Sequence, residues 1–328
     1  MMILVPTITS VIPSRVVEGG RVALEGIGLP TDVIPSVVVG QEAARTLFAS
    51  SSKIVIDLPH DVEGGRTPVR VESVPGETIY LSVGAPWATG LHQVDNPVFD
   101  REGNLFVTYS GSRGQESPVS VFRVTPDGSR EPFVSGIVNA TSLAFGPDGH
   151  LYVSSRFEGA VYRVNQDGTH AQIASDLGVA CGLAFDADGA MYVGDRSGTI
   201  FRVRDGQATA FATLPPSVAA FHLAMSPDGE LFVSGPTLGT YDHIHRIDHA
   251  GNVRTVPTPF GRPQGLAFSP DGVLHVIDAL AGASGLYRFP TPDSEPELVV
   301  SGGALIGVAF GPAGELVVTS NDTAYRFD

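Results

Sequence analysis

Cysteine, lysine and tryptophan are almost absent from this chain of 328 residues. It contains one Cys, Cys181, and one Lys, Lys53. A single cysteine excludes an intrachain disulfide and any zinc site built from several cysteines. Basic residues number 20 against 35 acidic residues, so the formal net charge is −15. Because a nucleic-acid binder must neutralise phosphates, this balance argues against a nucleic-acid partner.

Long apolar runs are also missing from the sequence. No apolar stretch reaches the roughly 18 residues that mark a membrane-spanning helix, so we expect no membrane span. The opening MMILVPTITSV lacks a basic segment followed by an apolar run, so it reads as a strand and not as a signal peptide. We therefore expect a cytoplasmic protein, or an extracellular one if a leader has been removed.

The chain has no sustained 3.6-residue apolar period, and its 39 Gly and 25 Pro residues favour short strands over helices. One phrase, an apolar run, a turn ending in Gly and a second apolar run, recurs along the last three quarters. The six copies are PVFDREGNLFV (97–107), LAFGPDGHLYV (143–153), LAFDADGAMYV (183–193), LAMSPDGELFV (223–233), LAFSPDGVLHV (266–276) and VAFGPAGELVV (308–318). Such internal repetition is the strongest fold signal a sequence carries.

The copies begin 40 to 46 residues apart, which is typical of the four-stranded blades of a β-propeller. Each copy is followed by an aromatic residue or His and then Arg. These pairs are Phe122-Arg123, Tyr162-Arg163, Phe201-Arg202, His245-Arg246, Tyr287-Arg288 and Tyr325-Arg326. A residue present in every blade indicates a scaffold role, so we expect these arginines to bond carbonyls or an acidic turn of the next blade.

The last copy has only three strands before Asp328, which leaves one blade edge without a partner. The segment PWATGLHQVDNPVF (86–99) aligns without gaps to PFVSGIVNATSLAF (132–145), whose first part reads as an outer strand. We therefore predict that Pro86–Gly90 supplies the missing outer strand, with Trp87 in the place of Phe133. The prediction is a six-bladed propeller over residues 86–328.

Residues 1–85 lack the repeat and predict an immunoglobulin-like β-sandwich. The expected strands are 8–12, 21–28, 36–40, 53–59, 67–73 and 78–84, separated by Pro and Gly. The opening ITSVIPSRVVEGGRVALEGIGL, with the later VVVG and PVRVES, resembles the IPT/TIG family. This resemblance implies a spacer, an oligomerisation surface or a ligand platform, and no reaction.

A propeller binds its ligands at the central channel, near the starts of the inner strands. The residues expected there are Asp95, Thr141, Cys181, Phe221, Gln264 and Ile306, followed by Asn96, Ser142, Gly182, His222, Gly265 and Gly307. The first six of these positions differ in every copy, and polar side chains gather at Asp95, Asn96, Thr141, Ser142, Gln264 and His222. The predicted ligand-binding residues are Asn96, Thr141, Ser142, Cys181, Phe221 and Gln264.

The phrase GLAF-S-PDG-x-L resembles NHL-repeat propellers and is similar to the regucalcin/gluconolactonase-like superfamily, which is six-bladed. The first family mostly binds, and the second hydrolyses sugar lactones with one divalent cation. That resemblance implies a calcium ion held by Asp95, whose run to Phe99 matches the family's acidic-small-Pro-Val-aromatic opening. Gln264 would be a further ligand, Thr141 would lie beside it and His222 would act as base. The Asn and Asp ligands that the family carries in its later blades are not found here, because the corresponding positions are Cys181, Phe221 and Gln264.

Other histidines and acids leave further alternatives open. Streptogramin-lyase-like propellers need a His base, for which His222 and His275 are available. His243 and His245 lie on one strand face and could hold zinc, although His245 occupies the aromatic position of the repeat. Asp195 and Asp278 each end a second strand and either reach the channel or cap a loop. The sequence thus predicts a propeller that binds a small molecule or a protein; the alternative is a metal-dependent lactone or ester hydrolase.

Overall fold

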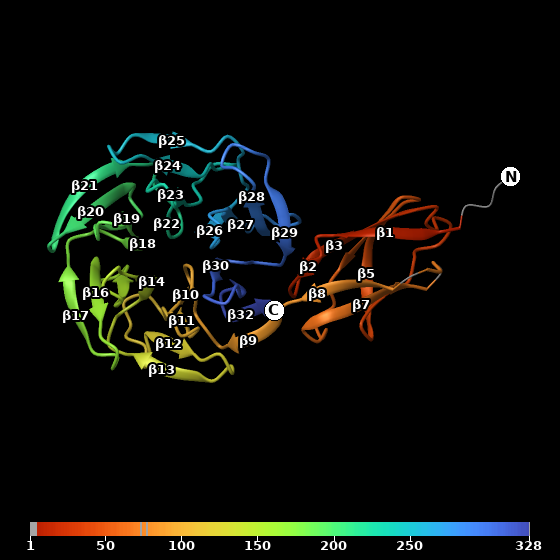
Figure 1. Cartoon of the computed structure of the whole chain (residues 1–328), viewed down its shortest axis with the longest axis horizontal. Coiled ribbons are helices and arrows are strands. Elements are labelled where there is room, and N and C mark those ends of the chain that lie inside the picture. The colour runs from red at the N-terminus through yellow and green to blue at the C-terminus, as the bar shows by residue number, and fades with distance from the viewer. Residues whose placement is uncertain (1–4, 73, 77, 328) are drawn as a thin grey trace.

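The computed structural model describes all residues except 1–4, 73, 77 and 328, and the described chain consists of strands and loops only. Strands 8 residues long or shorter follow one another, as the frequent Gly and Pro require. Figure 1 shows a ring of strands with a smaller group of strands attached at its rim. Within the described residues no helix is long and apolar enough to span a membrane.

The smaller group contains eight strands around one apolar core that includes Leu24, Ile54 and Leu81. They are β1 (Thr7–Ile12), β2 (Arg15–Val16), β3 (Arg21–Ile27), β4 (Val37–Val39), β5 (Glu42–Ala49), β6 (Lys53–Asp57), β7 (Gly65–Val71) and β8 (Ile79–Val83). All six predicted strands are present; position 73, at the end of one of them, lies outside the described residues. Strands β2 and β5 were not predicted.

The ring is a β-propeller with five separate four-stranded sheets. Their strands are β10 (Val98–Phe99), β11 (Leu105–Thr108), β12 (Val121–Val124), β13 (Arg130–Val134); β14 (Ala140–Phe145), β15 (Leu151–Ser155), β16 (Ala160–Val164), β17 (His170–Ala174); β18 (Ala180–Phe185), β19 (Met191–Asp195), β20 (Thr199–Arg204), β21 (Gln207–Thr213); β22 (His222–Met225), β23 (Leu231–Ser234), β24 (His245–Ile247), β25 (Val253–Thr255); and β30 (Gly307–Phe310), β31 (Leu316–Thr319), β32 (Thr323–Phe327), β9 (Ala85–Thr89).

The prediction of six separate blades is therefore corrected to five. The repeat at 266–276 forms the antiparallel ladder β26 (Pro263–Phe268), β27 (Leu274–Asp278), β28 (Gly285–Phe289) and β29 (Glu297–Ser301), but this ladder belongs to a twelve-stranded sheet. The cause is β2, which pairs in parallel with both β29 and β8. An outer strand with a free edge accepted a strand from the N-terminal group, so the two sheets merged.

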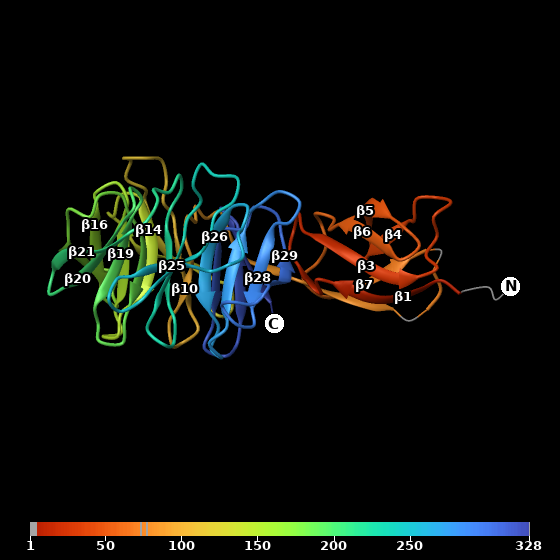
Figure 2. The same cartoon turned by 90° about the horizontal axis from the view of Figure 1, so that it is seen from above.

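The contact between the two parts is dense. The Val17 amide donates to the Ser301 carbonyl at 2.9 Å, and the Arg21 amide donates to the Ser301 hydroxyl at 2.7 Å. Val17 is buried in one apolar cluster with Val300 and Phe327 of the propeller. Seen from above in Figure 2, the N-terminal strands continue the disc of the propeller outward from β29.

The predicted closing strand is present as β9, one residue earlier than expected. It pairs antiparallel with β32, where Pro86 lies opposite Tyr325 and Ala88 opposite Ala324. Trp87 stacks on Phe99 of the next blade with ring centroids 5.9 Å apart. The ring is thus closed by strands from both ends of the repeat region, which leaves no free edge at β32.

The repeated arginines were predicted to bond carbonyls or an acidic turn of the next blade. Arg326 does so, since its Nη1 donates to the Pro126 carbonyl at 3.2 Å, but the acidic partners of other repeated arginines lie in their own blades. Arg123 pairs with Glu131 at 2.6 Å, and Arg163 pairs with Asp148 at 3.1 Å. Each inner strand starts on the face of the disc where the second strand of its blade ends, because these strands are antiparallel. We call this the upper face. The Asp-Gly hairpins between the first two strands lie on the lower face.

Candidate functional site

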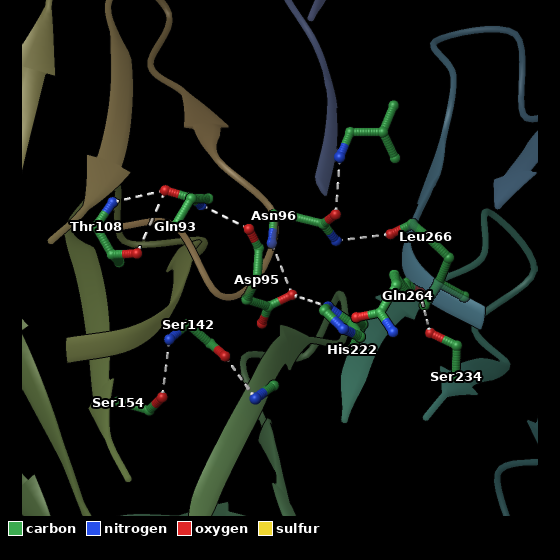
Figure 3. A network of polar contacts seen from close by, with 12 residues as sticks. Gln93, Asp95, Asn96, Thr108, Ser142, Ser154, His222, Ser234, Gln264 and Leu266 are labelled. Atoms are coloured by element: carbon green, nitrogen blue, oxygen red, sulfur yellow. Dashed lines mark hydrogen bonds and ion pairs between the residues drawn. The ribbon is translucent and has the colours of Figure 1, made fainter. Parts of the chain in front are cut away.

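A network of polar side chains connects the segment around Asp95 to His222 and to the neighbouring blades (Figure 3). The inner strands follow one another around it in the order β10, β14, β18, β22, β26 and β30, and β30 contacts β10 again. Asp95, Thr141, Ser142, Cys181, Phe221, His222 and Gln264 are all buried. The structure therefore brings the predicted residues of different blades together around one axis.

Asp95 and His222 form a pair that crosses the channel. His222 Nδ1 lies 2.5 Å from Asp95 Oδ1, although the two residues are 127 positions apart. Asp95 precedes β10, and His222 begins β22, which lies on the opposite side of the ring of inner strands. Their relative exposures are 4% and 0%, so solvent screens the pair very little. The amide of Asn96 donates to the same carboxylate oxygen at 2.7 Å.

The segment around Asp95 is held in the channel by its own amide side chains. Gln93 Nε2 donates to the Asp95 carbonyl at 2.6 Å, and Gln93 Oε1 accepts from the Thr108 amide at 2.8 Å. Asn96 Nδ2 donates to the Leu266 carbonyl at 2.9 Å. Asn96 Oδ1 accepts from the Val308 amide at 3.0 Å. This segment, residues 93–96, thus forms a plug that links the first blade to three others.

Serine side chains connect further neighbouring inner strands. Ser142 Oγ accepts from the Gly182 amide at 2.5 Å, and the Ser142 amide donates to Ser154 Oγ at 3.1 Å. Thr141 Oγ1 donates to the Asn139 carbonyl at 2.8 Å. Three predicted ligand-binding residues therefore form these hydrogen bonds with the protein itself: Asn96, Thr141 and Ser142.

Two side chains of the channel have polar atoms that form no hydrogen bond with a described residue. The side-chain amide of Gln264 makes no hydrogen bond to any described residue, while its backbone carbonyl accepts from Ser234 Oγ. His222 Nε2 is buried and has no partner among the residues that the structure describes. If Nδ1 donates its proton to Asp95, the neutral ring presents an acceptor at Nε2. Buried polar atoms without partners are rare, and they indicate a position for a water molecule or a ligand.

Cys181 and Phe221 contribute apolar surface to the same ring. Burial raises the pKa of the Cys181 thiol to about 12, and the negative charge of Asp95 adds to this effect. The thiol is therefore neutral at physiological pH and cannot act as a nucleophile, which requires the thiolate. Phe221 is among the largest fully buried side chains. Both residues shape the channel and form none of its hydrogen bonds in the described chain.

The residues around Asp95 do not fit the divalent cation that the gluconolactonase-like resemblance implies. Calcium takes six to eight oxygen ligands, several of them carboxylates. Here the Asp95 carboxylate already accepts from His222 and from the Asn96 amide. No group of three or more His, Cys, Asp or Glu side chains in the described part of the chain is placed to hold a metal ion.

The other candidate residues have local roles. His243 Nδ1 lies 3.1 Å from the Val256 carbonyl, and His275 Nδ1 lies 3.0 Å from the Val273 carbonyl. Asp195 accepts from the Val179 amide at 2.8 Å, and Asp278 accepts from the amide of Arg262 at 2.8 Å. The two aspartates therefore cap loops of the upper face.

Sequence reasoning missed a cavity on the lower face. It has a volume of about 890 Å³ and is lined by Phe99, Phe133, Phe145 and Phe310 together with charged residues such as Asp148. Most of these aromatic residues occupy repeated positions, which give no sign of a cavity. Gln93 and Thr108 were also missed, because nothing in a single loop sequence shows which strand its side chains contact.

Known proteins match this chain in structure and not in sequence. No protein-family model matches it, and no curated protein matches it. A gluconolactonase from Xanthomonas campestris is 17% identical over 74% of this chain and 88% of its own, with a TM-score of 0.62. An auxiliary nutrient binding protein from Bacteroides thetaiotaomicron is 10% identical over 97% of this chain and 96% of its own (TM-score 0.57). A virginiamycin B lyase from Staphylococcus aureus is 15% identical over 94% and 99% (TM-score 0.54). At these identities the likeness shows the propeller fold alone.

Proposed function

We propose that this protein is a ligand-binding propeller whose site is the upper mouth of the channel. One observation carries the proposal: His222 Nε2 is buried without a partner among the described residues. Gln264 lies on the neighbouring inner strand, and its backbone carbonyl, not its side-chain amide, accepts from Ser234. A small molecule that donates to Nε2 and bonds the amide satisfies both groups. The nutrient-binding neighbour from Bacteroides supports a binding role for this fold.

We further propose that residues 1–85 are an immunoglobulin-like module of IPT/TIG type and that residues 86–328 are the propeller domain, of NHL-repeat type. In this proposal the module acts as a rigid platform at the rim. The pairing of β2 with β29 supports that role, because a main-chain ladder fixes orientation better than a flexible linker.

A thermal-shift screen tests the binding site. The wild type is screened against organic acids, sugars and sugar lactones, and each hit is repeated with Gln264→Leu and with Gln166→Leu. Gln166 lines the lower-face cavity, so it provides a matched control. We expect the shift to be lost in Gln264→Leu and retained in Gln166→Leu. The reverse pattern would place the ligand on the lower face and overturn the proposal.

The second candidate function is hydrolysis of a lactone or similar ester, and the Asp95–His222 pair favours it. An imidazole oriented by a carboxylate can take a proton from water as the water oxygen attacks the ester carbonyl, and the carboxylate stabilises the imidazolium that forms. The gluconolactonase neighbour supports this candidate. No step is assigned to a metal ion, since the residues present do not fit one.

Acid release from gluconolactone, followed in a pH-stat, tests this candidate. Hydrolysis faster than the spontaneous rate, and its loss in His222→Gln, would support the enzyme. A rate equal to the spontaneous one would exclude it for this substrate. Calcium, zinc and manganese are added in parallel. A rise in melting temperature that Asp95→Ala abolishes would support a metal site at Asp95. No rise with any of the three metals would exclude that site.

A further inference from the structure

Three arginines lie together on the upper face beside the channel. Arg156 directly follows β15 and Arg196 directly follows β19, so they occupy equivalent positions in consecutive repeats. Their backbone amides donate to equivalent carbonyls, those of Asn139 and Val179. Arg113 lies in the loop between β11 and β12, which runs over the same face.

The side chain of Asn139 joins the Arg113 loop to Arg156. Asn139 Oδ1 accepts from the Gly114 amide at 2.7 Å, and Asn139 Nδ2 donates to the Ser112 carbonyl at 2.9 Å. The Asn139 backbone carbonyl accepts from the Arg156 amide. One buried asparagine thus holds the residues on both sides of Arg113 and the backbone of Arg156. The main chain from which each of the two guanidinium groups extends is therefore fixed.

None of these three guanidinium groups has an acidic partner among the described residues. The arginines of the repeat differ, because Arg123 and Arg163 both pair with carboxylates. The aspartate beside Arg196 is already committed: Asp195 accepts from the amides of Val179 and Ser197 and from the Ser197 hydroxyl. Three arginines without acidic partners thus lie at one mouth of a chain with a net charge of −15.

Mutual repulsion adds to the effect of burial at this place. Arg156 is half-buried; burial lowers its pKa most, and the positive charges of Arg196 and Arg113 lower it further. The charges of Arg156 and Arg196 also act on Cys181, at the start of β18 in the channel, which locates the group next to the candidate site. An oxyanion between the guanidinium groups would offset the repulsion and accept bidentate hydrogen bonds.

Exposed apolar side chains border the three arginines. Phe157, which follows Arg156, is 53% exposed, and Val218 is 41% exposed. Val218 adjoins Ser217, whose amide donates to the Arg196 carbonyl at 3.0 Å. A cationic centre with apolar borders suits an oxyanion carried on an apolar body better than a fully hydrated inorganic ion.

We propose that Arg113, Arg156 and Arg196 form an anion subsite of the channel mouth, and that the ligand is an organic carboxylate with an apolar body. This inference rests on the proposed binding function, because it assigns the ligand class of the same mouth. Inorganic phosphate shares the oxyanion chemistry, so the test has to distinguish the two sources.

The test is calorimetric titration of the full chain at constant ionic strength with sodium hexanoate, hexanamide and sodium phosphate. The variant is Arg156→Gln/Arg196→Gln. The control is Arg45→Gln/Arg101→Gln, which changes the net charge equally at two exposed arginines without acidic partners in the described chain. We expect the wild type and the control to bind hexanoate, and the variant to lose at least about tenfold in affinity. Hexanamide should not bind, and phosphate should bind more weakly than hexanoate.

Several outcomes would overturn the inference. Equal losses in the variant and the control would show unspecific charge attraction, and equal binding of hexanamide would show an apolar site. Phosphate binding as tight as hexanoate would exclude the apolar body. A melting temperature several degrees below that of the wild type would mean that the two arginines hold the fold. If hexanoate binding fails while Gln264→Leu still loses a screening hit, the channel-mouth function stands without the anion subsite.

Discussion

The Asp95–His222 pair offers the sharpest test of the channel's architecture. Removing one partner of a buried hydrogen bond to a carboxylate costs about 3–5 kcal/mol, because the remaining group is left unpaired in a medium of low polarity. Both side chains are almost completely buried, so solvent does not reduce this cost in unfolding free energy. We expect His222→Ala and Asp95→Ala each to destabilise the propeller by about this amount.

The change in melting temperature follows from the size of the propeller. A unit of roughly 240 residues has an unfolding entropy of about 0.5 kcal/mol/K near its midpoint. A loss of about 3–5 kcal/mol then lowers the melting temperature by about 6–10 °C. Circular dichroism on heating measures this shift, and urea unfolding at 25 °C measures the free energy.

A double-mutant cycle separates the pair from its surroundings. When both side chains are removed together, no unpaired group remains, so Asp95→Ala/His222→Ala should be less destabilised than the sum of the single variants by about 2 kcal/mol or more. Thr319→Val serves as the control, because Thr319 ends β31, is buried, and its hydroxyl has no partner among the described residues. Its effect should stay below about 1 kcal/mol.

Two results would refute this reasoning. Additive single variants would mean that the two side chains do not interact, despite the 2.5 Å between Nδ1 and Oδ1. A loss in His222→Ala no larger than that of Thr319→Val would mean that the imidazole contributes only shape. In either case the plug would be held by its backbone and amide contacts instead.

Three further predictions concern other parts of the fold. Cys181, with a pKa raised to about 12, should resist a thiol reagent at pH 8 until the chain unfolds, because the reactive thiolate forms only as the pH approaches that value; rapid labelling of the native protein would contradict this. Gly265→Ala should lower the melting temperature, since the new Cβ would clash with Asn96 Oδ1 and the Ile306 carbonyl oxygen. Gly303→Ala should leave it unchanged, because its Cβ would lie 3.5 Å from the nearest atom, the Gly19 carbonyl oxygen. Val17→Asp should loosen the N-terminal module and add a separate melting transition that Val33→Asp, at an exposed position, does not produce; a single transition in both variants would disprove it.

The sequence predicted the propeller because its signals are local and repeated. The Asp-Gly turns fix where each hairpin lies, and the alignment of 86–99 with 132–145 located the closing strand to within one residue. It did not predict that β2 would join β29. Two residues, Arg15 and Val16, carry no periodicity, and their partners lie at Val300 and Ser301, far along the chain. Pairing over such distances depends on how the two parts pack, which no local pattern records.

The candidate site was predicted in its residues and not in its interactions. The positions where the copies differ do converge on the channel, but Asn96, Thr141 and Ser142 bond to the protein itself. The sequence could not show that Asp95 would find His222, because an across-channel contact has no fixed spacing. The arginines at 156 and 196 were also missed, since each looks like an ordinary loop residue until the two repeats are adjacent.

The upper mouth and the cavity of the lower face are built from different positions of the repeat. The cavity of the lower face is built largely from repeated aromatic and turn positions, whereas the upper mouth is built from the positions that differ. Phe99 and Phe310 line the lower-face cavity, and neither belongs to the hydrogen-bonded network of Asp95 and His222. Substitutions at those two phenylalanines should therefore leave binding at the upper mouth unchanged. The residues that distinguish one blade from the next, and not the repeat itself, would set what the protein recognises.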